Sequence, residues 1–200
     1  MGYNLFMTRY VLVGGYPYKA KDGGKKMCEE AVSGLKEPVK ILICLFARKK
    51  EEWQKLLGDN ADFFKRNLPD KKLEFTLADE SIFLEQIEEN DLIYFSGGDT
   101  VDLENVLDRI NGWQEKLSDK SVMGSSAGTD IFSKYSYDIE FFKLADNYGL
   151  VPVKTIVHYG SKEYTPPIGW QKAYQELENY KEKLPIWALA EGDFKSIIVE

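Results

Sequence analysis

Histidine and cysteine are scarce in this sequence, which has 200 residues but only one histidine, His158, and two cysteines, Cys28 and Cys44. Zinc sites usually draw about four ligands, mostly from Cys and His, and small disulfide-bonded domains need several cysteine pairs. The composition therefore argues against a zinc site and a disulfide framework, and we expect the protein to hold no metal.

Long apolar runs and an excess of basic residues are also absent. No segment approaches the roughly 18 consecutive apolar residues of a membrane-spanning helix. The formal net charge is −7, whereas nucleic-acid-binding domains carry basic surfaces that neutralise phosphates. Residues 1–9 do not combine a basic segment with an apolar core, as a signal peptide would. We expect a cytoplasmic protein that binds neither membranes nor nucleic acids.

Short apolar segments alternate with amphipathic ones over most of the chain. Continuous apolar strands separated by helices are typical of a parallel sheet that is covered on both faces. We predict an α/β fold, a doubly wound, mainly parallel, flavodoxin-like sheet, in one domain spanning residues 1–200. The expected strands are 10–13, 39–45, 73–77, 91–95, 121–123, 150–157, 186–190 and 195–199. The expected helices are 21–35, 48–68 with a break at 58–60, 81–89, 100–110 and 170–183. Gly-Asp at 192–193 indicates a hairpin between the last two strands.

Small residues follow several of the expected strands, at the edge where open α/β sheets bind ligands. The segment 124–128, Gly-Ser-Ser-Ala-Gly, fits the Gly-x-Ser-x-Gly pattern between a strand and a helix. Small neighbours let the central residue, Ser126, occupy a strained turn with its hydroxyl exposed. Ser126 is therefore a candidate nucleophile, and the N–H of Ala127 a candidate oxyanion donor. Alternatively, the segment is only a glycine-rich turn in which Ser126 or Thr129 caps a helix.

A second glycine loop, Ser96-Gly97-Gly98-Asp99-Thr100, follows the strand expected at 91–95. Its N–H groups are candidates for a second oxyanion donor, while Asp99 or Thr100 is suited to cap the next helix. Neither Gly-x-x-x-x-Gly-Lys nor Gly-x-Gly-x-x-Gly occurs, here or at Gly14-Gly15, so we expect no cofactor.

If an imidazole activates Ser126, only His158, at a strand end, can supply it. A lone histidine in this position is also compatible with a purely structural role. A carboxylate is needed to orient the imidazole. The candidates are Asp138, Glu140 and Glu191, and the sequence alone does not decide among them.

Taken together, these residues resemble the dipeptidase E and cyanophycinase family of serine peptidases, whose fold is similar to the class I glutamine amidotransferase domain. The matching segments are Gly14-Gly15, 97–100, 124–128, 149–152 leading into His158-Tyr159, and 190–192. The resemblance as a whole covers residues 10–199.

The resemblance implies a hydrolase that cleaves small peptides through an acyl-enzyme. It implies Ser126 as nucleophile, His158 as base, and Gly98 with Ala127 as oxyanion donors. Glu191 is the implied third member, with Asp138 as the alternative. It further suggests that Gly97, Asp99 and Tyr159 contact the substrate.

Two features differ from the pattern of the family. Relatives that prefer an amino-terminal aspartate carry asparagine where Asp99 stands, so this preference is not implied here. The interval from Ser126 to His158 is also shorter than in those relatives. The alternative to an enzyme is a non-catalytic domain that binds a small ligand on the same fold, and the protein is expected to be a monomer or a homodimer.

Overall fold

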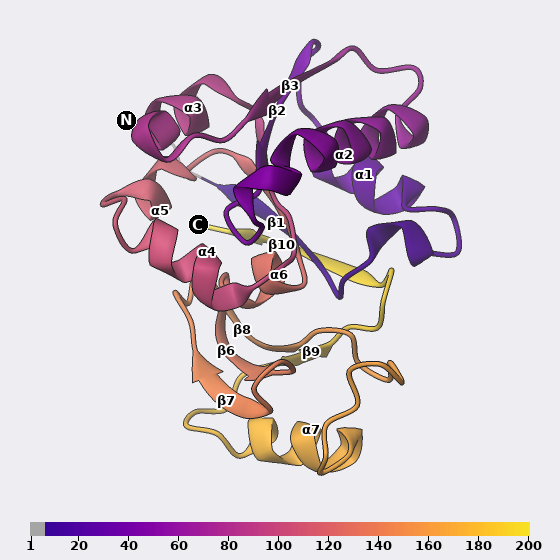
Figure 1. Ribbon diagram of the computed structural model, residues 1–200, viewed down its shortest axis with the longest axis vertical. Coiled ribbons are helices and arrows are strands. Elements are labelled where there is room, and N and C mark those ends of the chain that lie inside the picture. The colour runs from indigo at the N-terminus through magenta and orange to yellow at the C-terminus, as the bar shows by residue number, and fades with distance from the viewer. Residues whose placement is uncertain (1–6) are drawn as a thin grey trace.

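The computed structural model describes residues 7–200. The segment 1–6, where no signal peptide is expected, lies outside the described residues. The chain forms a larger and a smaller β-sheet with helices packed around them (Figure 1). No helix within residues 7–200 is long and apolar enough to cross a membrane.

The larger sheet has six strands in the order β10-β1-β5-β4-β2-β3. All neighbouring strands are parallel except β10, which runs antiparallel to β1. This arrangement confirms the predicted α/β fold with a mainly parallel sheet. The strands are β1 (Thr8–Val13), β2 (Val39–Cys44), β3 (Leu73–Leu77), β4 (Leu92–Phe95), β5 (Ser121–Ser125) and β10 (Phe194–Val199).

Helices cover both faces of this sheet (Figure 1). Within β1, Leu12 points into the apolar layer under α3, α4 and α5, whereas Val11 and Val13 point into the layer under α1 and α2. Burial on both faces explains why the central strands are continuously apolar. The helices are α1 (Lys25–Ala31), α2 (Trp53–Asn67), α3 (Phe83–Glu89), α4 (Thr100–Leu107) and α5 (Trp113–Lys116), with short 3-10 turns at Pro17–Lys19, Lys50–Glu52 and Glu80–Ile82.

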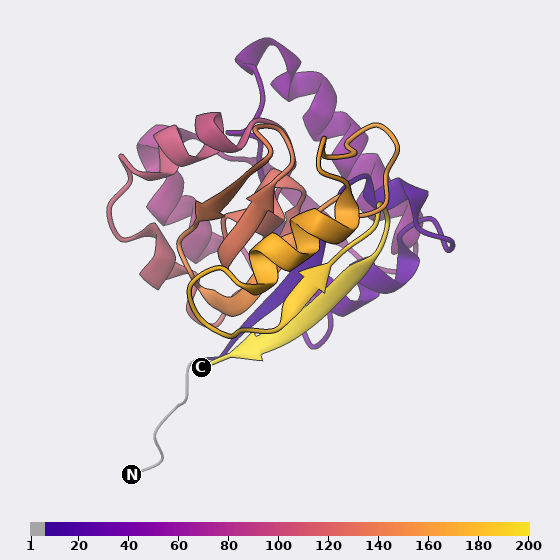
Figure 2. The ribbon, with the colours of Figure 1, turned by 90° about the horizontal axis from the view of Figure 1, so that it is seen from below.

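The smaller sheet has four strands in the order β7-β6-β8-β9, and α7 covers it (Figure 2). The elements are α6 (Ala127–Asp130), β6 (Ser133–Asp138), β7 (Lys143–Asp146), β8 (Val151–Ile156), α7 (Trp170–Glu178) and β9 (Ile186–Ala188). Sequence analysis did not predict β6 or β7, because their residues are largely polar. Ser133 and Ser136 are nevertheless buried, and the Ser133 hydroxyl bonds backbone oxygens.

The predicted hairpin between the last two strands is wrong. A turn does form, since the Asp193 N–H donates to the Ala190 carbonyl, and Gly192 has a φ of 78°. However, β9 joins the smaller sheet and β10 joins the larger one. The turn thus connects two sheets rather than two paired strands.

The predicted break at residues 58–60 is also wrong, because α2 continues through it. A Cβ on Gly58 would meet no atom within 4 Å, so this glycine faces open space and disturbs no packing. The Asn60 side chain bonds the Leu56 carbonyl within the helix. Helix α1 is shorter than predicted, since Gly24 precedes it in a left-handed conformation.

Candidate active site

Ser126 occupies a sharp turn between β5 and α6. Its φ of 53° and ψ of −118° are strained values for a residue with a side chain. The flanking glycines are required for close packing. A Cβ on Gly124 would lie 2.1 Å from the Gly128 carbonyl oxygen, and one on Gly128 would lie 2.3 Å from that of Phe95. The alternative role of Ser126 as a helix cap is not seen, because its side chain makes no capping hydrogen bond.

The Ser126 hydroxyl lies 3.0 Å from Nε2 of His158, which follows β8. His158 has a positive φ of 51°, and its N–H donates to the Gly14 carbonyl at 2.7 Å. Its ring packs directly over Gly15, where a Cβ would lie 2.3 Å from Nε2. The glycine at the end of β1 therefore makes room for the imidazole.

The other imidazole nitrogen, Nδ1, lies 3.1 Å from Oε1 of Glu191. The second carboxylate oxygen of Glu191 pairs with the Lys19 ammonium. Asp138, the alternative acid, is engaged elsewhere, because its Oδ1 accepts the N–H groups of Glu140 and Phe141. The geometry thus joins Glu191, rather than Asp138 or Glu140, to the histidine.

The charges around His158 favour a neutral imidazole beside an ionised carboxylate. Burial lowers the pKa of His158 below 6.5, and Lys19 lowers it further, although Glu191 opposes the change. Burial alone would raise the pKa of Glu191, but the hydrogen bonds from Lys19 and His158 outweigh it and hold that pKa below its ordinary value. A neutral imidazole can accept a proton from the Ser126 hydroxyl.

Two tyrosines enclose the imidazole. The Tyr16 ring meets His158 edge-on at a centroid distance of 5.0 Å, and the Tyr164 ring lies 4.3 Å away. Their hydroxyls bond each other at 2.6 Å. The rings shield His158 from water and restrict its rotation.

The loop after β4 lies against the elbow. A Cβ on Gly97 would come within 2.9 Å of the Ser126 Cβ, and one on Gly98 within 2.0 Å of the Ala47 carbonyl oxygen. Within residues 7–200, the N–H groups of Gly98 and Ala127 donate no hydrogen bond to the protein, so both are free for a ligand. Asp99 caps α4, because its Oδ1 accepts the N–H groups of the two residues that follow Thr100.

Ser126 and His158 open into a cleft of about 1210 Å³. Gly97, Gly98, Asp99, Ala127 and Asp138 also line it. Tyr159, which sequence analysis suggested as a substrate contact, is not brought there. Its ring packs against Trp170 and Tyr174 beside α7, and Tyr164 takes the place at the cleft.

Comparison with known families identifies the chain. Residues 45–198 match the family model described as peptidase family S51. The chain belongs to peptidase family S51. It is a serine hydrolase of the peptidase class, and the resemblance to the dipeptidase E family is confirmed. No curated protein is significantly similar to it in sequence.

Two solved structures share the fold of this S51 peptidase. One is a peptidase from an acI-B1 Actinobacterium, with a TM-score of 0.65 and 21% identity over 97% of this chain and 84% of the other. The second is a candidate Peptidase E protein from Listeria monocytogenes EGD-e, with a TM-score of 0.65 and 18% identity over 96% of this chain and 98% of the other.

Sequence analysis missed several residues at the site. Lys19 and Tyr16 carry no motif, and only the folded chain brings them to Glu191 and His158. Asp130 also lines the cleft, although it is only 5% exposed. Its position four residues after Ser126, on the helix that follows the elbow, could have indicated it. Within residues 7–200, no three His, Cys, Asp or Glu side chains are grouped as metal ligands.

Proposed function

We propose that this S51 peptidase hydrolyses small peptides through an acyl-enzyme formed on Ser126. The observation that carries the proposal is the hydrogen-bonded series Ser126–His158–Glu191, with distances of 3.0 and 3.1 Å. This is the arrangement of nucleophile, base and orienting carboxylate that acyl transfer requires.

In the acylation step, the Ser126 oxygen attacks the peptide carbonyl carbon while Nε2 of His158 takes the hydroxyl proton. The negative charge moves to the carbonyl oxygen, which accepts hydrogen bonds from the N–H groups of Gly98 and Ala127. The C–N bond then breaks, and His158 gives the proton to the departing amine. Glu191 stabilises the imidazolium throughout without itself taking the proton.

In the deacylation step, water replaces the amine. His158 takes a proton from the water as its oxygen attacks the acyl carbon. Collapse of the second tetrahedral intermediate breaks the bond to Ser126, releases the carboxylic acid and returns the proton to the serine. One water is consumed and one peptide bond is cleaved.

The size of the cleft supports a small substrate. Its volume of about 1210 Å³ lies just above the range of sites that enclose small molecules, roughly 300–1000 Å³. Tyr16 and Tyr164 border the cleft beside His158 and narrow the approach to it. We therefore expect dipeptides and other short peptides, rather than folded proteins, as substrates.

Intact mass after incubation with a fluorophosphonate tests the proposal. We expect one adduct on the wild type and none on Ser126→Ala, with kcat/KM for short peptides reduced at least about 10³-fold in Ser126→Ala and His158→Ala. A folded wild type that forms no adduct and hydrolyses no peptide would instead favour the non-catalytic ligand-binding alternative.

A further inference from the structure

The Ala47–Arg48 segment, which follows β2, holds the glycine loop on both sides of Gly98. On one side, Nε of Arg48 donates a hydrogen bond to the Gly97 carbonyl oxygen at 2.5 Å. On the other side, the Asp99 N–H donates to the Ala47 carbonyl at 2.9 Å. The backbone around Gly98 is therefore fixed at two points by the same short segment.

The Gly97 carbonyl and the Gly98 N–H belong to one peptide unit, which is planar and trans. The two groups point in opposite directions, so a donor that holds the carbonyl also sets the direction of the N–H. This peptide unit borders the nucleophile, because a Cβ on Gly97 would lie 2.9 Å from the Ser126 Cβ. Arg48 is thus connected to a candidate oxyanion donor through a single peptide group.

The backbone of Arg48 is itself anchored. Its N–H donates to the Leu45 carbonyl at 2.8 Å, and its carbonyl accepts the indole N–H of Trp53 at 2.8 Å. Trp53 packs against the apolar layers on both faces of the larger sheet. The core of the larger sheet therefore fixes the point from which the Arg48 side chain reaches the glycine loop.

The charge of Arg48 is not paired with a carboxylate. None of the ion pairs found in the described part of the chain includes this residue. Arg48 lines the cleft together with Gly98 and Ser126. A hydrogen bond from a charged donor polarises the peptide that accepts it and strengthens the N–H at the other end. The guanidinium thus favours negative charge on an atom that the Gly98 N–H contacts.

We propose that Arg48 is a positioning residue of the oxyanion site. It orients and polarises the Gly97–Gly98 peptide, so that the Gly98 N–H binds the charged oxygen of the transition state more strongly than the neutral carbonyl of the substrate. Arg48 acts through this peptide and does not contact the reacting atoms. The inference rests on the proposed function, because it assigns a role within the same reaction.

Arg66 provides a matched control. It lies on α2 and lines the cleft, as does Asp62 of the same helix. Among the hydrogen bonds found within residues 7–200, the one from an arginine to the glycine loop comes from Arg48 and not from Arg66. Replacing Arg66 therefore removes the same charge from the cleft without releasing the loop.

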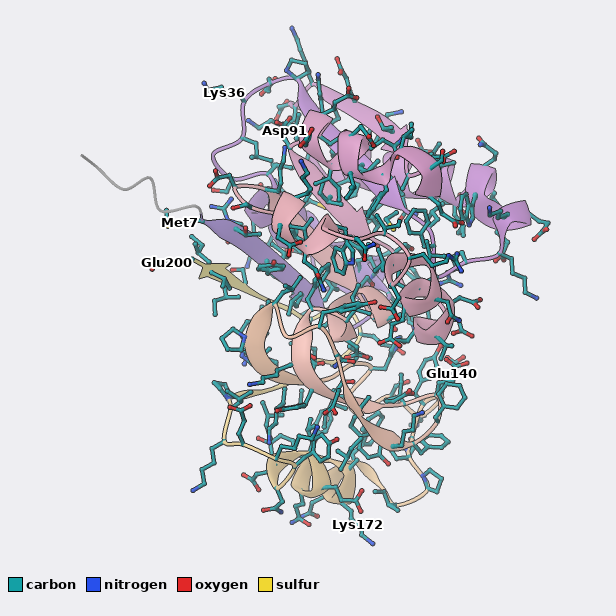
Figure 3. The ribbon with its side chains drawn as sticks, turned by 90° about the vertical axis from the view of Figure 1, so that its left-hand side faces the viewer. Met7, Lys36, Asp91, Glu140, Lys172 and Glu200 are labelled. Atoms are coloured by element: carbon teal, nitrogen blue, oxygen red, sulfur yellow. The ribbon has the colours of Figure 1, made fainter. Side chains whose placement is uncertain are left out.

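The cleft is also open to small solutes. Glu140, another residue of its lining, is exposed and lies at the edge of the molecule, at the level where the two sheets meet (Figure 3). Arg48 is exposed as well. A guanidinium ion from solution can therefore reach the place that the Arg48 side chain leaves when it is truncated.

The rate of labelling by the fluorophosphonate tests the inference. In this reaction His158 takes the hydroxyl proton, the Ser126 oxygen bonds to phosphorus and fluoride leaves, while negative charge develops on the phosphoryl oxygen. Intact mass gives the maximal labelling rate, kinact, and the half-saturating concentration, KI, for wild type, Arg48→Ala and Arg66→Ala. Arg48→Ala is also measured with guanidinium chloride at a low, non-denaturing concentration and with the same concentration of sodium chloride. Thermal unfolding checks that each variant is folded.

We expect kinact to be about tenfold lower in Arg48→Ala, with KI changed less than about threefold, because the charge develops only after binding. This loss is smaller than the roughly 10²–10³-fold loss of an oxyanion donor itself, since Arg48 is exposed and its charge is screened. Arg66→Ala should keep kinact within about twofold of wild type. Guanidinium, but not sodium, should bring kinact of Arg48→Ala to within about threefold of wild type, because it replaces the donor to the Gly97 carbonyl.

An unchanged kinact in Arg48→Ala would overturn the inference. An equal loss in Arg66→Ala would also overturn it, because the effect would then be one of overall charge. A loss that guanidinium does not restore would assign the effect to a displaced loop and would exclude the polarising role. All three outcomes require that the wild type is labelled, whereas failure of the proposed function would leave the wild type without an adduct on Ser126.

Discussion

Replacing Asp130 with asparagine should stabilise the protein at pH 8 but not at pH 4. Burial raises the pKa of Asp130 to about 8; the Thr155 hydroxyl opposes this, while Asp138 and Glu104 add to it. The same carboxyl titrates near 3.8 in an unfolded chain. Between these values the folded protein holds a proton that the unfolded chain releases, so the free energy of unfolding falls as pH rises.

The size of the effect follows from this difference in pKa. Each pKa unit corresponds to about 1.4 kcal/mol, so the full interval is worth on the order of 5 kcal/mol. Asp130 borders a water-filled cleft, which reduces the cost of its charge, and we expect about 2–5 kcal/mol. Asparagine is uncharged and can still accept the Thr155 hydroxyl, so Asp130→Asn removes the titration without leaving a cavity.

Urea unfolding at several pH values between 4 and 8.5 measures this effect. We expect wild type and Asp130→Asn to unfold with similar free energies at pH 4, and the variant to gain steadily above that pH. Asp62→Asn controls for the loss of a carboxylate from the cleft. A difference between wild type and Asp130→Asn that does not change with pH, or that favours the wild type at pH 8, would show that Asp130 does not take up a proton on folding.

Four further variants test the site and its supporting structure. Gly15→Ala places a Cβ 2.3 Å from the His158 ring, at a residue whose φ is 105°. We therefore expect kcat/KM to fall about 100-fold and the free energy of unfolding to fall by about 1 kcal/mol or more. Normal activity would show that the ring can move aside. Lys19 lowers the pKa of His158, whereas Glu191 raises it. In pH profiles of kcat/KM, the acidic limb of the wild type should lie below pH 6.5. In Lys19→Met this limb should move to higher pH. In Glu191→Gln it should move to lower pH with a reduced maximum, and shifts of the opposite sign would contradict the charge assignment. Lys154 is fully buried, and its Nζ donates hydrogen bonds to three carbonyls at the end of α7. Lys154→Met should therefore lower the free energy of unfolding, measured in urea, by about 2–4 kcal/mol. A loss below about 0.5 kcal/mol would mean that water satisfies these carbonyls.

The larger sheet was accessible from the sequence because burial on both faces makes its central strands continuously apolar, while the edge strand β3 alternates apolar and polar residues. The smaller sheet was only partly accessible. Strand β8 has an apolar run, but β6 satisfies its buried polar groups through hydrogen bonds such as those of Ser133, and β7 is a short edge strand without a buried residue. Side chains that are buried by hydrogen bonding rather than by hydrophobicity leave no apolar period to recognise.

The residues of the site also differ in how far they could be predicted, depending on whether their role follows from neighbouring residues or from residues distant in sequence. Ser126 could be proposed as a nucleophile because its elbow depends on adjacent glycines. Lys19 and Tyr16 could not be assigned, since their contacts with Glu191 and His158 join elements distant in sequence. The family resemblance suggested Tyr159 as a substrate contact, but the backbone turn at His158 sends its ring toward α7 instead.

The two glycines that end β1 explain how the chain brings the histidine and Glu191 together. The Gly14 carbonyl accepts the His158 N–H at 2.7 Å, and the Gly14 N–H donates to the Asp193 carbonyl at 3.0 Å. The Gly15 carbonyl accepts the Gly192 N–H at 2.9 Å. One dipeptide thus holds the backbone on both sides of the His158–Glu191 hydrogen bond. The turn at 190–193 leads from the smaller sheet to β10 in the larger one, so the pairing of β10 with β1 also fixes the carboxylate. The relative position of the two sheets is therefore set at the same residues that align His158 with Ser126.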